Sequence, residues 1–254
     1  MNIATTLNEK LLKQPFTHIQ NDSTLLIEYQ QIAERYAKME NSIAVLSDLR
    51  LNKSYIYNGG VAVELGLSKR NSIEKIDSIW EEDLFNKIHP DDLIKKHLLE
   101  LQFFHLLKSL PCEERSDYHI ISKMRVLDKT GNYIAIQHRM FYICNNSSGN
   151  LWLALCLYNH SCERFSIETF DGIIINSATG RIFNLDKQTC SNILSIREKE
   201  ILLLIEKGKL SKEIADILSI SKNTVDRHRQ NILEKLRVKN SMEACRVAKS
   251  MNLL

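Results

Sequence analysis

Apolar residues recur every three or four positions in the first half of the chain, and this spacing predicts helices. The clearest cases lie over 23–40 and 90–110. Pro90 suits the first turn of the second helix, and Pro111 stops it. Two shorter helices are predicted between these segments, over 61–67 and 80–85.

Other segments have the pattern of strands. Residues 118–128 and 133–144 alternate between apolar and polar side chains, as half-buried antiparallel strands do. Residues 151–158 are apolar throughout and predict a third strand. Shorter strands are predicted over 43–46 and 55–57. This order of elements predicts an α+β fold in which helices cover one face of an antiparallel sheet.

From residue 191 onward the pattern is all helical and predicts a four-helix domain. Ser195 and Glu198 have the spacing of a capping box, and Gly208 is expected to end that first helix. Ser219 and Ile220 form a tight turn between the second and third helices, which makes a helix-turn-helix. The expected caps of the later helices are Ser211, Ser221, and Asn240 or Ser241.

The third helix of this domain has two different faces. Val225, Ile232 and Leu236, with His228 between them, form the inward stripe. The opposite face carries side chains that can read base edges in the major groove, namely Asn223, Asp226, Arg227 and Gln230. Five neighbouring residues can hold phosphates, which fixes register rather than sequence: Lys212, Lys222, Thr224, Arg229 and Lys235.

Four consecutive stretches of this region closely resemble the LuxR-type DNA-binding domain. They are 194–202, 208–215, 220–228 and 231–236, and the match as a whole covers about 60 residues nearly continuously. The resemblance implies that the third helix enters the major groove. It also implies that the fourth helix mediates dimerisation, through a face that carries Ala244, Val247 and Met251.

One residue departs from the family pattern. Many members carry a basic residue where this chain has Asp226. A carboxylate beside the phosphates repels them, so we expect lower non-specific affinity for DNA.

The segment over about 42–160 resembles a PAS domain. The resemblance is carried by Ile88-His89-Pro90-Asp91-Asp92 before a helix, by the turn at 128–131, and by 61–66 after Asn58-Gly59-Gly60. It implies a domain that senses a small molecule, binds a cofactor or dimerises. No cofactor is identified by the sequence. His97 and His105 lie where haem-binding relatives can place an iron ligand, but packing or surface roles are favoured because no second ligand accompanies them.

Composition is that of an ordinary soluble globular protein, with 44% hydrophobic and 26% charged residues in 254. The longest apolar run, 151–158, is too short to cross a bilayer. Charged Glu9, Lys10 and Lys13 stand where a signal peptide needs apolar residues. We therefore expect a cytoplasmic protein with no membrane association. The cysteines form no Cys-x-x-Cys pair and no standard ligand spacing, so we also expect no metal site.

Charge is distributed unevenly along the chain. Residues 190–254 contain 13 basic and 8 acidic residues, a balance of +5, whereas residues 1–189 have a balance of −2. A basic segment on an acidic body favours a polyanion partner, here double-stranded DNA.

Two short motifs offer an enzymatic alternative. Ser72-x-x-Lys75 and Lys129-Thr130-Gly131 have the form of serine β-lactamase motifs, but they are too close to enclose a helical domain. The same Ser-x-x-Lys form occurs at Ser219, inside the helix-turn-helix. We therefore expect no enzymatic activity.

The sequence thus predicts a sequence-specific, dimeric DNA-binding transcriptional regulator. Its N-terminal domain senses a signal, with room for a small-molecule ligand, or dimerises. The alternative is a protein-interaction module with weak or no DNA binding. The predicted parts are a helical extension over 1–41, the PAS-like domain over 42–160, a linker that can hold a hairpin over 161–190, and the DNA-binding domain over 191–254.

Overall fold

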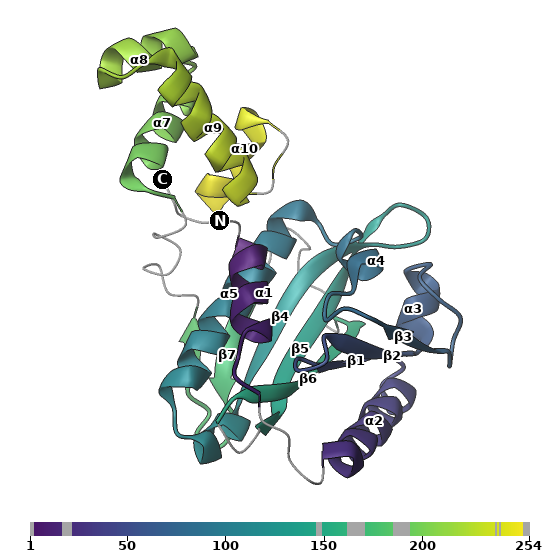
Figure 1. Ribbon diagram of the computed structural model, residues 1–254. Coiled ribbons are helices and arrows are strands. Elements are labelled where there is room, and N and C mark those ends of the chain that lie inside the picture. Colours follow the sequence, from purple (N-terminus) through teal and green to yellow (C-terminus); the bar gives the residue numbers. More distant parts are fainter. Residues whose placement is uncertain are drawn as a thin grey trace. The chain divides into compact units, whose positions relative to one another are not determined.

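The computed structural model describes residues 3–16, 22–145, 149–161, 171–184, 194–236, 238 and 240–250. The chain forms two compact units (Figure 1). One, the sheet unit, comprises residues 8–184. The other, the helical unit, comprises residues 185–254 together with residues 1–7.

The sheet unit is built on one eight-stranded sheet in which every neighbouring pair is antiparallel. The strand order is β3-β2-β1-β6-β5-β4-β7-β8. β4, β5 and β6 form a meander, and its last strand, β6, pairs with β1. The strands are β1 (Ile43–Asp48), β2 (Lys53–Asn58), β3 (Ile73–Ile76), β4 (Tyr118–Leu127), β5 (Tyr133–Asn145), β6 (Leu151–His160), β7 (Asp171–Asn176) and β8 (Ile182–Asn184).

Most helices outside the C-terminal region lie where the apolar spacing predicts them. They are α1 (Ile3–Leu12), α2 (Asp22–Met39), α3 (Gly60–Glu64), α4 (Glu82–Phe85), α5 (Pro90–Ser109) and the 3-10 helix η1 (Cys112–Asp117). The pattern did not predict α1, β3 or η1.

Helices cover both faces of the sheet, which differs from the one-sided arrangement expected. Leu153, Leu155 and Leu157 of β6 belong to a core cluster with Ala33 and Ala37 of α2. The alternate residues of β6 point to the other face, where Ala154 and Cys156 line a small cavity with residues of α5. Figure 1 shows α2 and α5 on opposite sides of the sheet.

This two-sided cover explains the continuous apolar run at 151–158. All eight of these residues are buried. A strand covered on both faces has no solvent side, and its sequence therefore does not alternate.

The segment expected as a linker contributes to the sheet. The hairpin between β7 and β8 forms, with Asn176 Oδ1 accepting the Thr179 N–H at 2.9 Å in its turn. β7 also pairs along β4, from Tyr118 opposite Asn176 to Lys123 opposite Asp171. Residues 171–184 therefore extend the sheet and do not merely connect two domains.

The first turn of α5 is tied to β4 by a charged contact. Asp92 is completely buried and accepts two hydrogen bonds from the Arg125 guanidinium, at 2.6 and 2.9 Å. Its Oδ2 also accepts the Arg125 backbone N–H at 2.8 Å. The paired Asp92 carboxylate raises the pKa of Arg125, despite the opposing effect of burial. This pair attaches the start of α5 to β4.

We expect Asp92→Ala to lower the free energy of unfolding of the sheet unit by about 3 kcal/mol, because it breaks a bidentate, largely buried charge pair. Urea unfolding followed by tryptophan fluorescence measures this, since Trp80 and Trp152 both lie in the sheet unit. Glu113→Ala, at an exposed carboxylate, is the matched control. Equal midpoints for the two variants would contradict the role given to Asp92.

Candidate nucleic-acid interface and cavity

The helical unit contains the four predicted helices: α7 (Ile196–Glu206), α8 (Ser211–Leu218), α9 (Lys222–Leu236) and α10 (Ser241–Ser250). The capping box at the start of α7 is present, with the Ser195 N–H donating to Glu198 at 2.7 Å and the Glu198 N–H donating to Ser195 Oγ at 3.3 Å. Gly208, with φ +78°, follows the end of α7 as expected.

The caps of the later helices agree with the sequence at two of three positions. Ser221 Oγ accepts the Thr224 N–H at 3.0 Å, and Asn240 Oδ1 accepts the Glu243 N–H at 2.9 Å. The expected cap at Ser211 is wrong, because α8 is preceded by Leu210 and already includes Ser211. The Leu210 N–H instead donates to Glu213 at 2.8 Å.

The turn between α8 and α9 reverses the chain at a left-handed residue. Ser219 has φ +53°, a conformation that non-glycine residues seldom adopt. The Ile220 N–H then donates to the Ala215 carbonyl at 3.0 Å, which closes the end of α8. Two helices joined in this way make a helix-turn-helix.

Three aliphatic residues fix the orientation of α9. Val225, Ile232 and Leu236 are each at most 1% exposed, and they belong to the inward stripe that the sequence predicts. His228 is half-buried between them. Burial of this stripe leaves the opposite side of α9 free.

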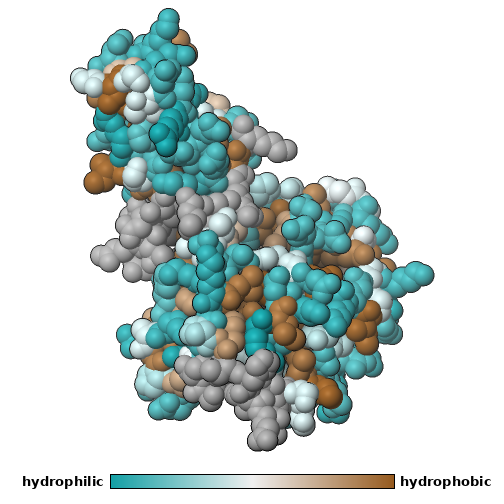
Figure 2. Space-filling model, in the orientation of Figure 1, coloured by the Kyte–Doolittle hydropathy of each residue, from teal (hydrophilic) through white to brown (hydrophobic). Residues whose placement is uncertain are grey.

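The predicted base-reading residues lie on that free side. Asn223, Arg227 and Gln230 are exposed, and Asp226 is partly exposed. On the face drawn in Figure 2, hydrophilic residues dominate the surface of the helical unit. The side chains that can read base edges are thus accessible together on one helix.

Asp226 is held by its neighbours. Its carboxylate lies 3.3 Å from the Lys222 ammonium. A hydrogen bond with Ser211, together with Lys222, keeps the pKa of Asp226 below its ordinary value. The negative charge that we expected to repel phosphates is therefore partly balanced within the unit.

The five predicted phosphate contacts fall into two groups. Lys212, Lys222 and Thr224 are exposed near the start of α8 or α9. Arg229 instead donates to Ser211 Oγ at 3.0 Å and to Ser241 Oγ at 3.1 Å, which links the first residues of α8 and α10. Lys235 lies 2.6 Å from the carboxylate of Glu198, which is 3% exposed.

The Lys235 contact joins α9 to α7. Burial alone would raise the pKa of Glu198, but hydrogen bonds from Lys235 and Ser195 lower it. In this conformation Arg229 and Lys235 hold the helices together, and their charge is directed at least partly inward.

The predicted dimerisation residues Ala244 and Val247 are completely buried in α10. Neither offers surface to a second subunit in this conformation. Met251 lies outside the described residues. The exposed apolar residue on α10 is Met242, at 76%.

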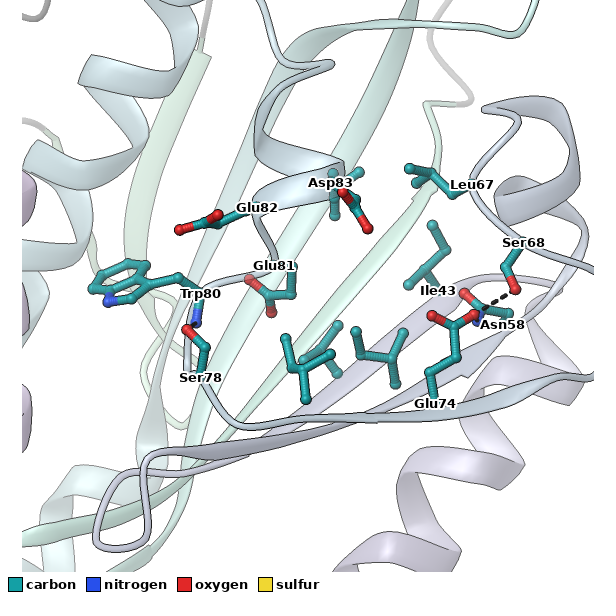
Figure 3. Close-up of a pocket in the computed structure, with 14 residues that line it drawn as sticks. Ile43, Asn58, Leu67, Ser68, Glu74, Ser78, Trp80, Glu81, Glu82 and Asp83 are labelled. Carbon is teal, nitrogen blue, oxygen red and sulfur yellow. Dashed lines mark hydrogen bonds between the residues drawn. The ribbon is translucent and has the colours of Figure 1, made fainter.

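The sheet unit contains a cavity of about 370 Å³ bounded by β1, β2, β3 and the segment that leads into α4 (Figure 3). Fourteen residues line it, and four of them are acidic: Glu74, Glu81, Glu82 and Asp83. Glu81 is 6% exposed, and burial raises the pKa of its carboxyl group to about 7. Trp80, which the aromatic pattern of the sequence favours as a core residue with a cavity wall as the alternative, is among the lining residues. Glu81 belongs to no motif, so its place at this site could not be predicted from the sequence.

The histidines considered as iron ligands have other environments. His97 is buried and packs edge-on against Trp80 and Phe85, at 5.6 and 5.7 Å between ring centroids. His105 is exposed. Across the described ranges, no group of three or more His, Cys, Asp or Glu side chains is placed to hold a metal ion. No helix in the described part of the chain has the length and apolar character needed to cross a membrane.

A helix-turn-helix with an accessible polar recognition helix defines the class of DNA-binding transcription regulators. Sequence comparison gives the family. The profile described as "Bacterial regulatory proteins, luxR family" matches residues 192–248. Transcriptional activator protein EchR of Dickeya chrysanthemi is 31% identical over 193 residues, which cover 73% of each chain. The chain belongs to the LuxR family of bacterial regulatory proteins.

Two further comparisons cover very different shares of the chain. Uncharacterized response regulatory protein YgeK of Escherichia coli is 43% identical over 67 residues, which cover 26% of this chain and 46% of YgeK. The crystal structure of the phage VqmA–DPO complex aligns with 92% of this chain and 90% of the VqmA chain, at 14% sequence identity and a TM-score of 0.31. A likeness this low supports no conclusion about the fold.

We expect Glu81→Gln to change how stability depends on pH. The folded-state pKa of about 7 lies above the ordinary 4.5, so between these values the native state keeps a proton that the unfolded chain has lost. The free energy of unfolding therefore falls as pH rises through this window, by up to ~3 kcal/mol. Glu81→Gln lacks this fall.

Urea unfolding at a series of pH values, followed by tryptophan fluorescence, measures the effect. The free energy of unfolding of Glu81→Gln, relative to that of the unsubstituted chain, should increase from about pH 5 to about pH 8. Glu82→Gln, at an exposed carboxylate, should show no such growth. Parallel curves for Glu81→Gln and the unsubstituted chain would refute the assignment.

Proposed function

We propose that this protein is a cytoplasmic regulator that binds specific DNA sites as a homodimer and whose sheet unit binds a small-molecule signal. The observation that carries DNA recognition is the accessible row of Asn223, Arg227 and Gln230 on α9, opposite a fully buried aliphatic stripe. Arg can bond guanine with two hydrogen bonds, and Asn or Gln can do the same with adenine.

Phosphate contacts would position this helix. The exposed Lys212, Lys222 and Thr224 are the first candidates, since their side chains are accessible near the starts of α8 and α9. Arg229 and Lys235 are proposed to contribute positive charge from their places between helices. Asp226 would act at the same face, with its charge moderated by Lys222.

The sheet unit is proposed to be PAS-like. Support comes from the order of its elements over residues 42–160: two strands, short helices, a long helix and a three-stranded meander that returns beside β1. The cavity of about 370 Å³ gives this unit space for a ligand.

A homodimer would place two recognition helices about one helical turn of DNA apart. The fourth helix, α10, is the proposed contact between subunits. Since Ala244 and Val247 are buried, the exposed Met242 is the apolar residue of α10 best placed to meet a partner.

Salt dependence tests DNA binding against the alternative of a protein-interaction module. We expect the logarithm of the DNA association constant to fall linearly with the logarithm of salt concentration, with a slope of about −0.9 per phosphate contacted. Fluorescence anisotropy with labelled duplexes, selected from random sequence by the full-length protein, measures the slope. A flat response, or no selected sequence, would favour the interaction module.

Arg227→Ala is expected to weaken binding to the selected site by ~1–3 kcal/mol and to relax the preference at one base pair of each half-site, because a bidentate base contact is lost. Arg227→Lys is the matched control, since it keeps the charge but not the paired donors. It should retain the salt slope and lose the preference. If Arg227→Ala weakens binding to all sequences equally, Arg227 is a phosphate contact.

A further inference from the structure

The cavity of the sheet unit has an apolar floor. Ile43 and Val45 of β1, Ile56 of β2 and Ile76 of β3 contribute side chains to it, and Leu84 of α4 also lines the cavity. Its volume of about 370 Å³ lies within the range of small-molecule sites. A ligand seated here must therefore present apolar surface over much of its area.

The charged groups around the cavity are all of one sign. Its fourteen lining residues include four carboxylates and no Lys, Arg or His. At one end, the Glu74 carboxylate already accepts hydrogen bonds from Asn58, at 2.8 Å, and from Ser68 (Figure 3). Glu74 is thus satisfied within the protein.

Glu81 differs from Glu74. Figure 3 shows its carboxylate pointing into the cavity above the apolar floor. Among the described residues, no hydrogen bond or ion pair joins this carboxylate to another side chain, although the residue is only 6% exposed. A backbone hydrogen bond and the nearby Lys96 favour the ionised carboxylate of Glu81, but burial outweighs them and raises its pKa. A cation beside a buried carboxylate of this kind offsets the cost of ionising it.

The nearest buried cation is already engaged. Behind Glu81 lies a small chamber of about 30 Å³, where the Lys96 ammonium pairs with Glu100 at 2.5 Å. The same ammonium lies 4.6 Å from the centroid of the Phe85 ring. With Lys96 and Glu100 compensating each other, the ionised cluster keeps one excess negative charge, and that charge faces the cavity at Glu81.

We propose that this cavity binds a small amphipathic amine, whose ammonium group pairs with the Glu81 carboxylate while its apolar part covers the floor formed by Ile43, Val45 and Ile76. An anionic ligand would meet only like charges. A neutral ligand would not offset the charge of the ionised carboxylate, so Glu81 would keep its proton and gain nothing from ionising. The proposal rests on the proposed function of the sheet unit as a ligand-binding domain, and it adds the chemical class of the ligand.

The affinity for an amine should depend on pH. Lys96 and Glu100 of α5, Tyr142 of β5 and Cys156 of β6 line the small chamber together with Glu81. The hydroxyl of Tyr158 also interacts with Glu81 electrostatically. Glu74, Glu82 and Asp83 share its cavity. Burial raises the pKa of Glu81 to about 7. The ionised fraction of Glu81, and with it the affinity for an amine, should therefore increase as pH rises from about 6 to about 8.

The test uses matched compounds and the full-length chain. Three skeletons (hexyl, 2-phenylethyl and 2-(indol-3-yl)ethyl) are each compared with an amine, a hydroxyl or a carboxylate as the terminal group, by isothermal titration calorimetry at roughly pH 8. We expect at least one amine to bind about tenfold or more tightly than its alcohol, and no carboxylate to bind as tightly. Glu81→Gln should reduce the amine preference to about twofold or less, whereas Glu82→Gln should largely retain it.

Three outcomes overturn the proposal. An alcohol or carboxylate that binds as tightly as its amine shows a ligand site of another class and leaves the proposed function standing. An amine preference that survives in Glu81→Gln places the counter-charge elsewhere. If no compound binds, both the amine site and the support that the cavity gives to ligand sensing are overturned. DNA recognition is tested separately, by the salt dependence of DNA binding.

Discussion

The division of α9 into a buried and a free side is the constraint on which the functional account depends. Val225, Ile232 and Leu236 are removed from water on one side of the helix, and burial of each such side chain contributes roughly 1.5–3 kcal/mol. A helix anchored in this way cannot rotate without exposing its aliphatic stripe. The stripe therefore determines that Asn223, Arg227 and Gln230 are the residues offered to a partner.

Polar contacts complete this arrangement around the aliphatic core. Arg229 joins the starts of α8 and α10 through two serine hydroxyls, and Lys235 joins α9 to Glu198 of α7. Because Glu198 also forms the capping box with Ser195, a single carboxylate connects the start of α7 to α9. Arg229 and Lys235 therefore help to hold α9 in place, while the proposed contacts with phosphates fall first to the exposed Lys212 and Lys222.

The sheet unit combines a buried central strand with a cavity that lies nearer one edge of the sheet. Its central strand β6 is buried along residues 151–158, whereas the cavity is bordered by β1, β2 and β3, which lie toward one edge of the sheet. The buried charges Glu81, Lys96 and Glu100 are expensive for folding, which fits a place where charge serves binding rather than stability.

Strongly periodic segments could be predicted from the sequence, and the misses have physical causes. The helix over 90–110 and the strands over 118–128 and 133–144 were predicted because their side chains face different environments at regular intervals. β3 was missed because Ile73 and most of its neighbours are exposed at the sheet edge. The pairing of β7 with β4 depends on contacts between distant residues, which a local pattern does not contain.

The candidate interface could be predicted in part for the same reason. Helical spacing identifies the free face of α9, but it does not show which basic side chains turn back to neighbouring helices. Lys235 is of this kind, since its partner Glu198 lies 37 residues away in the sequence. Arg229 is another, with partners that lie 18 and 12 residues away. Glu81 could not be found at all, because only the assembled fold surrounds it with apolar side chains.

The most direct test of the central claim is guanine N7 methylation interference on the selected DNA site, because N7 lies in the major groove where α9 is placed by this account. Methylation of particular guanines in each half-site should block binding of the unsubstituted protein, and one of these positions should lose its effect with Arg227→Ala. Binding that tolerates methylation at every guanine, yet is blocked by modification in the minor groove, would contradict the account.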